Sequence, residues 1–210
     1  MASFGLRPVR TMGGSTWEGQ CVTCLIPSTD ATNYFVGDPV VGLAAGGAQL
    51  GITAGFIALG AGASQEDLGF YPQVGIAAAA GANRIYGVIV SFEAGRADLS
   101  KQYGLASTVR IVRVAPAYPD TVFEVYEDGT GALTGVGNTM SLAAGAGGSV
   151  VTGYSSWVLA ASTAGTGSLQ TIAVGVSNRL GNVSPGSVNC VWEVVIAQPQ
   201  ISATQLGAGI

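Results

Sequence analysis

Short apolar runs recur along this chain, and each run ends at Gly, Pro, Asn or Asp. β-Branched and aromatic residues are common in them, and their lengths suit strands better than helices. A series of such runs separated by turn residues is typical of β-sandwiches and barrels. We therefore predict an all-β protein: a single β-sandwich, jelly-roll-like or barrel domain with Gly/Ala-rich loop insertions and few short helical turns. The clearest runs span residues 23–27, 33–37, 84–93, 108–115, 121–127, 155–161, 169–178 and 189–197.

The positions of these runs suggest how the chain is divided. Residues 1–20 precede the first run and are predicted to form an N-terminal arm. Residues 21–198 hold all the runs and are predicted to form the β domain, with a Gly/Ala-rich insertion near 42–82. Within it, 129–168 carries no charged residue and is predicted to be a looser second lobe. Residues 199–210 are predicted to be a C-terminal tail.

Two local features qualify this pattern. Weak helical signals at 62–69 and 96–104 predict one or two turns each. In the run 108–115, Arg110 and Arg113 are three residues apart and cannot share one face of a regular strand. This spacing predicts a bulge between them or a strand end.

Charged residues make up only 10% of the chain, against about 25% in an ordinary soluble protein. Lys101 is the single lysine. A soluble monomer needs many surface charges of both signs. We therefore expect much of the surface to be covered by copies of the chain or by a partner. The net charge of −4 gives no basic patch, which argues against direct binding of nucleic acid.

The uncharged stretch 39–65 is long enough to cross a bilayer. Glycines interrupt it, however, and neither flanking cations nor an aromatic belt accompanies it. We predict short strands and loops here, with no membrane association. The N-terminal sequence MASFGLRPVR lacks the apolar segment of a secretion signal, so we expect a protein made in the cytoplasm.

The chain has three cysteines and no histidine. Cys21 and Cys24 have the spacing of a metal-binding knuckle, but a structural zinc takes about four ligands. Cys190 is the only other thiol. We predict no metal and no cofactor. An odd number of thiols fits a reducing compartment better than a disulfide framework.

The acidic stretch YPDTVFEVYEDGTG, residues 118–131, raises the question of an active site. Alternation along a strand puts Glu124 on the wetter face, opposite the apolar side chains. Glu127 then stands at the strand end, and Asp128 with the following Gly suits a tight hairpin. A carboxylate-based hydrolase would need Asp120 and Glu124 about 5–10 Å apart on one face. A solvated face and a turn explain every residue, so we predict no catalytic residue.

Several segments resemble the head decoration, or cement, proteins of tailed bacteriophages. The opening FGLRPVRTMGGSTWEGQ has their aromatic-Gly start and basic RPVR. The block IPSTDATNYFVGDPV follows, and then IYGVIVSFEAG and YGLASTVRIVRVAPAYPDTVFEVYEDG appear in the same order. The resemblance covers roughly 4–40 and 84–130. The Gly/Ala-rich middle, the uncharged 129–178 stretch and the C-terminal tail depart from the pattern.

This resemblance implies a β-rich, non-enzymatic subunit on the outer surface of the virion capsid. Its partners would be the major capsid protein and its own copies, with a homotrimer expected and a dimer as the alternative. We predict that Phe4, Arg7 and Arg10 contact the capsid as part of the N-terminal arm. Deletion of residues 2–14 should then abolish decoration without unfolding the domain.

Two other functions stay open at this point. The first is another virion β protein, such as a head fibre or tail adhesin that binds host glycans. It predicts exposed aromatic side chains in a groove and a lower copy number per virion. The second is the hydrolase that would use Asp120 and Glu124, for which Glu124→Gln would abolish activity and leave the fold intact.

Overall fold

The computed structural model describes residues 4–43, 52–57, 66–80, 84–94, 100–129, 131–145 and 147–200. It confirms the all-β prediction, and the one helical element among these residues is a short 3₁₀ turn, η1 (Leu133–Gly135). The strands are β1 (Leu6–Thr11), β2 (Val22–Ile26), β3 (Pro39–Gly42), β4 (Ile52–Ile57), β5 (Glu66–Pro72), β6 (Val74–Ile76), β7 (Gly87–Phe92), β8 (Arg110–Pro116), β9 (Thr121–Tyr126), β10 (Thr139–Ala143), β11 (Val158–Gly165), β12 (Thr171–Val176) and β13 (Val191–Ile196).

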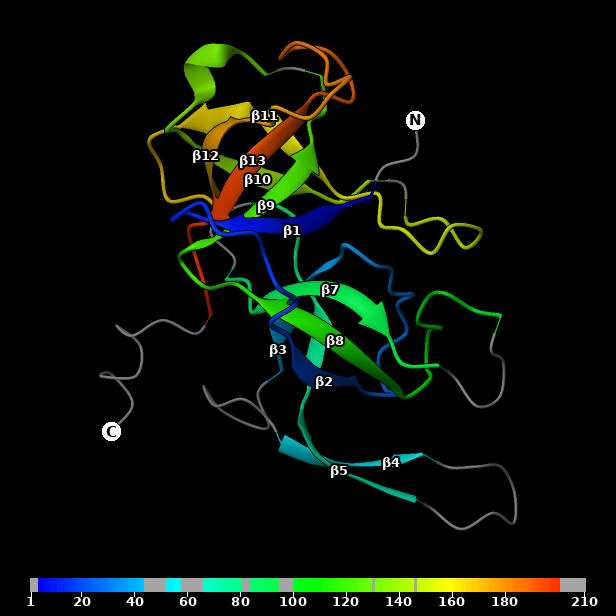
Figure 1. Ribbon diagram of the computed structural model, residues 1–210. Helices are drawn as coiled ribbons and strands as arrows, with labels where there is room; N and C mark the ends of the chain where they lie inside the picture. The colour runs from blue at the N-terminus through cyan, green and yellow to red at the C-terminus, as the bar shows by residue number, and fades with distance from the viewer. Residues whose placement is uncertain are drawn as a thin grey trace.

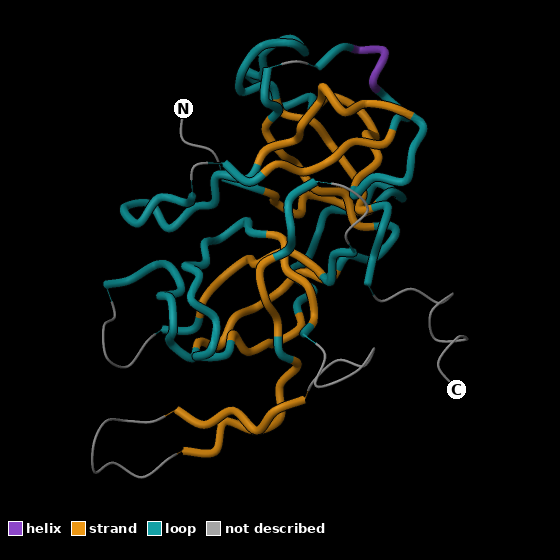
Figure 2. Tube along the Cα trace, turned by 180° about the vertical axis from the view of Figure 1, so that it is seen from behind, coloured by secondary structure: helices purple, strands orange, loops and turns teal. Residues whose placement is uncertain are grey.

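Two antiparallel sheets form the body of the molecule in a sandwich-like arrangement (Figure 1). The six-stranded sheet has the order β1-β9-β13-β12-β10-β11, and the five-stranded sheet has the order β2-β8-β7-β3-β6. Each sheet also curls back on itself, because isolated bridges join Glu127 to Leu159 in one and Leu25 to Gln73 in the other. Figure 2 shows the two curled sheets as separate lobes, with the two-stranded β4–β5 hairpin extending beyond the five-stranded one.

Alternation along β7 and β8 explains how the two lobes are joined. Ile89 and Val114 point into the core of the five-stranded lobe. Their neighbours Val88 and Ala115 belong instead to the core of the six-stranded lobe. Successive strand residues point to opposite faces, so these two strands separate the cores and contribute to both. Ile76 packs against both cores as well.

The predicted division of the chain needs correction. Residues 1–20 are not an arm outside the domain, because Leu6–Thr11 form β1 at the edge of the six-stranded sheet. The stretch 129–168 is not a separate, looser lobe, because β10 and β11 are part of that sheet. At the other end, Gln200 donates a backbone hydrogen bond to the carbonyl of Ile85, and residues 201–210 lie outside the described part.

The predicted helical turns and the predicted irregularity near Arg110 had different outcomes. Of the first helical candidate, residues 62–65 lie outside the described part, and the rest belongs to β5 (Glu66–Pro72) instead of a helical turn. Of the second, residues 96–99 lie outside the described part, and 100–104 form no helix. The spacing of Arg110 and Arg113 is explained by a strand end, because Arg110 is the first residue of β8. The bulge lies in the neighbouring β7, between Ile89 and Ser91. No helix in the described ranges has the length and apolar character needed to cross a membrane.

Candidate functional site

A bulge in β1 brings two arginines to the same face of the six-stranded sheet. In a regular strand, Arg7 and Arg10 would point to opposite faces because they are three residues apart. The pairing of β1 with β9 shifts register between Pro8 and Arg10, which inserts one extra residue. As a result Arg7 lies opposite Glu124 and Arg10 lies opposite Val122, two positions further along β9.

These arginines neutralise two glutamates that face each other across neighbouring strands. Glu124 on β9 lies directly opposite Glu193 on β13, an arrangement that is destabilising for like charges. Arg7 donates a hydrogen bond to the carboxylate of Glu124. Arg10 donates to one oxygen of Glu193 from Nη2 at 2.5 Å and from Nε at 3.2 Å. We call these four residues, with Arg179, the Arg–Glu cluster.

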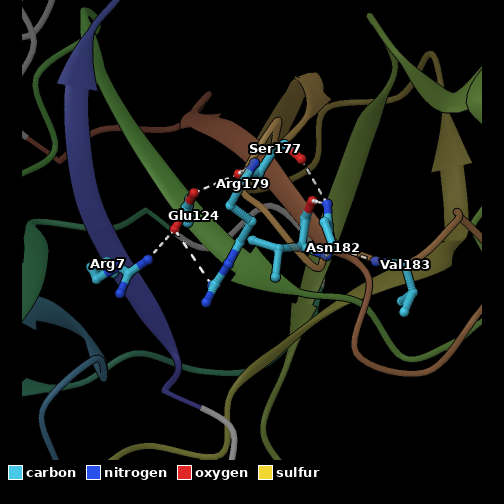
Figure 3. Close-up of polar contacts among 7 residues, drawn as sticks. Arg7, Glu124, Ser177, Arg179, Asn182 and Val183 are labelled. Carbon is cyan, nitrogen blue, oxygen red and sulfur yellow. Dashed lines mark hydrogen bonds and ion pairs between the residues drawn. The ribbon is translucent and has the colours of Figure 1, made fainter.

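Glu124 is buried, contrary to the prediction that it lies on the wetter face. It is 6% exposed, because the side chains of Arg7, Ser177 and Arg179 lie around its carboxylate. The Ser177 hydroxyl donates to its Oε1 at 2.6 Å, and Nη1 of Arg179 lies 3.9 Å from its Oε2 (Figure 3). The Arg7 side chain above it is 51% exposed, so the cluster reaches the surface through its arginines.

Phe4 contacts two of the three guanidinium groups of this cluster through its ring. The Arg7 guanidinium carbon is 4.7 Å from the Phe4 ring centroid, and that of Arg179 is 5.9 Å from it. The ring also packs on Tyr126, with 4.5 Å between centroids. Cation–π and aromatic contacts of this kind contribute about 0.5–1.5 kcal/mol each. Phe4, Arg7 and Arg10 therefore lie on one face of their own domain instead of forming a free arm.

Asn182 fixes the loop that carries Arg179. Its amide group donates to the carbonyls of Ser177 at 2.8 Å and Val191 at 3.0 Å. Its carbonyl accepts from the backbone N–H of Val191 at 2.8 Å and of Val183 at 3.0 Å (Figure 3). These four bonds tie the ends of the loop 177–191 together, so Arg179 is presented from a braced segment.

The buried carboxylate of Glu127 joins this loop to the one after β9. It accepts from the Trp192 indole at 2.7 Å and from the Gly186 backbone N–H at 2.6 Å, and the backbone of Gly131 donates to it too. Burial raises the pKa of this carboxyl, although the three N–H groups oppose that effect. Glu127 does follow the strand directly, but no hairpin turn comes after it, because β9 pairs with β1 and β13.

The two joined loops form an apolar end of the six-stranded lobe, at the top of Figure 1. Ten large apolar side chains are exposed among the described residues, and five of them belong to these loops. Leu180 is fully exposed and Leu133 is 69% exposed. We define the apolar loop end as Leu133, Val136, Leu180, Val183 and Val188.

The acidic pair suggested for a hydrolase does not assemble. Asp120 lies in the exposed turn before β9, whereas Glu124 is buried within the strand and paired with Arg7. Four steps along an extended chain span roughly 13 Å, beyond the 5–10 Å that paired carboxylates of glycosidases require. The alternation rule placed Glu124 correctly on the outer face but gave no sign that this face is covered.

The cysteines are packing residues in this structure. Cys24 and Cys190 are buried and Cys21 is half-buried, and all three are free thiols. Burial raises the pKa of Cys24 to about 12 and that of Cys190 to about 11, so both stay protonated at neutral pH. Among the residues that the structure describes, no group of three or more His, Cys, Asp or Glu side chains is placed to hold a metal ion.

Sequence reasoning identified Phe4, Arg7 and Arg10 but missed their partners Glu193, Ser177 and Arg179. One signal was available: Glu193 interrupts the apolar run of β13, and a charge in such a run calls for a partner on the adjacent strand. The apolar loop end carried no signal, because its members are scattered singly along two loops. No protein-family model, no curated protein and no solved structure matches this chain.

Proposed function

We propose that this chain is a structural virion protein that decorates and cements the capsid of a tailed bacteriophage. It would be made in the host cytoplasm and bind the outer capsid surface, bridging major capsid protein subunits and stabilising the shell. The proposal assigns it no catalytic role. The observation that carries it is the apolar loop end, a set of exposed aliphatic side chains held on two braced loops.

Exposed aliphatic side chains on a fixed support are suited to protein–protein contact. Scattered apolar residues on a surface need no explanation, but gathered ones mark interaction sites. Glu127 and Asn182 fix the two loops before any partner arrives, so little conformational entropy would be lost on binding. The low charge of the chain agrees with extensive burial of its surface in an assembly.

The Arg–Glu cluster provides a second, weaker contact in this proposal. Arg7 and Arg10 are already paired within the domain, so each would contribute only about 0–1 kcal/mol through its exposed part. Phe4, Arg7 and Arg10 thus orient the subunit on the capsid, and the apolar loop end supplies most of the affinity. A homotrimer around a local symmetry axis, or a dimer, would multiply modest contacts through effective concentration.

Mixing purified protein with undecorated capsids tests the proposal directly. Light scattering gives the oligomeric state, and cryo-electron microscopy of the mixture gives the occupancy of lattice positions. We expect regular, stoichiometric density with the wild type. The double substitution Leu133→Glu and Leu180→Glu should abolish it. Val151→Glu is the matched control, because Val151 is 85% exposed on a different loop. Bare capsids beside folded wild-type protein would refute capsid decoration.

A second candidate, a head fibre or tail adhesin that binds host glycans, is favoured by one observation. Trp17 and Tyr118 line a surface pocket, and this function predicts aromatic side chains in a groove. Copy number per virion separates the two candidates: hundreds of copies fit a decoration protein, and a few to some dozens fit a tail component. Quantitative gel densitometry of purified virions against the major capsid protein measures it.

A further inference from the structure

A pocket of about 190 Å³ lies beside the start of β9, away from the apolar loop end. Two aromatic residues and one proline contribute to its lining, and the other lining residues carry hydroxyl, amide and carboxylate groups. Pockets for drug-sized ligands occupy about 300–1,000 Å³, so this one accommodates a single ring. It is lined by Thr11, Trp17, Gln20, Pro116, Tyr118, Asp120 and Thr121.

Both walls of the pocket are fixed by backbone hydrogen bonds. The chain turns back after β1, and the N–H of Trp17 donates to the carbonyl of Val9 at 3.1 Å. The other wall is the turn before β9, closed by a bond from Thr121 N–H to the Tyr118 carbonyl at 3.0 Å. The N–H of Met12 donates to the Asp120 carbonyl at 2.7 Å and joins the two walls. The pocket is therefore formed without a ligand.

The chemistry of the lining selects the ligand class. Trp17 is half-buried against the core of the six-stranded lobe, and Tyr118 is 48% exposed. Aromatic rings of this kind offer apolar surface with little conformational freedom to lose. Asp120, Gln20 and the two threonines accept or donate hydrogen bonds to hydroxyl groups. A small ring with one apolar face and several hydroxyls matches both sets, and the carboxylate disfavours an anionic one.

We propose that this pocket binds one neutral hexopyranose ring of a glycan. The ring lies against Trp17 and Tyr118, and its hydroxyls donate to the Asp120 carboxylate. The site is independent of capsid decoration, since it shares no residue with the apolar loop end. Capsids decorated by a protein with this pocket would carry many copies of a weak glycan site on their outer surface.

Titration of the full-length protein with simple sugars, followed by ¹H–¹⁵N NMR, tests this site. The probes are the methyl glycosides of glucose, galactose and mannose, and N-acetylglucosamine. From the binding efficiency usual for small ligands, one ring is expected to bind with a Kd of about 1–10 mM. The Trp17 indole N–H signal should shift in a saturable way with at least one probe. Trp157 and Trp192 are buried in the core and are the internal controls, whose signals should not move.

Three variants make the test specific. Tyr118→Ala should weaken binding about fivefold or more through the lost ring contact. Tyr154→Ala is its matched control, because Tyr154 is 47% exposed on another loop, and it should leave the affinity unchanged. Asp120→Asn should weaken binding about tenfold, since hydrogen bonds to a charged acceptor are stronger than those to a neutral one.

Three results would overturn the proposal. One is the absence of a Trp17 shift with all four probes up to about 100 mM, roughly ten times the weakest affinity expected. Another is equal loss of affinity in Tyr118→Ala and Tyr154→Ala, which would indicate non-specific contact. The last is binding of N-acetylneuraminic acid as tightly as of the best neutral sugar, which would contradict the role of Asp120.

Discussion

At the scale of single residues, the buried carboxylate of Glu127 joins two loops. It accepts hydrogen bonds from Trp192 and from the backbones of Gly186 and Gly131. Three donors converge on two oxygens, so an isosteric amide cannot replace the carboxylate without directing its own N–H group at one of them.

Glu127→Gln should therefore destabilise the fold without creating a cavity. We expect the free energy of unfolding to fall by about 1–3 kcal/mol, the usual effect of an unsatisfied buried donor. Urea denaturation at pH 7, followed by circular dichroism, measures it. Glu18→Gln, on an exposed loop, is the control and should have no effect. Equal stability of both variants would show that Glu127 does not hold the loops.

A second buried carboxyl, Asp38, makes stability depend on pH. Asp38 is 3% exposed and accepts from the Phe35 backbone N–H at 2.8 Å and from Ser155. Burial outweighs these bonds and raises its pKa from 3.8 to about 6. The folded state thus keeps a proton that the unfolded state loses from about pH 4 upward. This contribution to stability is full below pH 4, is lost as the pH rises toward 6, and is constant above.

Asp38→Asn removes this dependence, because the amide stays neutral and its oxygen can still accept from Phe35. The wild type and the variant should be about equally stable at pH 4. At pH 7 the variant should be more stable by up to about 3 kcal/mol, which corresponds to the shift in pKa. Chemical denaturation of both proteins at several pH values between 4 and 7 gives the difference. Parallel curves would contradict the assigned pKa.

At the scale of elements, the bulge in β1 determines which residues can pair. If Val9 stayed but the pairing of β1 with β9 were regular, either Arg7 or Arg10 would turn to the opposite face. One of the buried glutamates of the Arg–Glu cluster would then lose its partner.

Deletion of Val9 would leave Arg7 and Arg10 two residues apart and on the same face. It should therefore keep both ion pairs and cost well below the about 3–5 kcal/mol expected from removing one partner of a buried ion pair. Val9→Ala keeps the register and should also cost far less. Thermal or urea unfolding of the two variants compares them. The predicted deletion of residues 2–14 is no longer a clean test of capsid contact, because it removes β1, with Leu6 from the core, and exposes the edge of β9. A loss of about 3–5 kcal/mol on deletion of Val9 would argue against a register set by the bulge.

Runs with strong β character could be predicted from the sequence, and seven of the predicted runs overlap β2, β7, β8, β9, β11, β12 and β13. The run 33–37 forms only isolated bridges through Tyr34 and Val36. The strands missed were short or unusual in composition, such as β3 and the arginine-containing β1. Their conformation is imposed by neighbours that come from distant parts of the chain.

The same reason limited prediction of the Arg–Glu cluster. Alternation along β9 places Glu124 on the outer face, but the strand order β1-β9-β13 decides that Arg7 and Glu193 flank it. β1 and β13, the first and last of these strands, are more than a hundred residues apart in the sequence. Neither the strand order nor a one-residue bulge produces a periodic pattern in the sequence. The pairing of these charges is therefore determined by the tertiary fold and could not be predicted from the sequence.

At the scale of the whole molecule, the two lobes share strands and core residues. Val88 and Ala115 of the five-stranded sheet complete the core of the six-stranded lobe, and Ile76 packs against both cores. Opening one lobe would therefore expose apolar surface of the other. We predict a single cooperative thermal transition, with equal calorimetric and van't Hoff enthalpies. Two resolved transitions would mean that the lobes fold independently.

The two cores contain different aromatic residues, so the intrinsic optical signals of the protein distinguish one lobe from the other. All three tryptophans of the chain lie in or against the core of the six-stranded lobe: Trp157, Trp192 and Trp17. The core of the five-stranded lobe contains Tyr34 and Tyr86 instead. Fluorescence emission from tryptophan thus follows one half of the protein, and the absorbance of buried tyrosine follows much of the other. Unlabelled protein in a stopped-flow cell would reveal which half forms first.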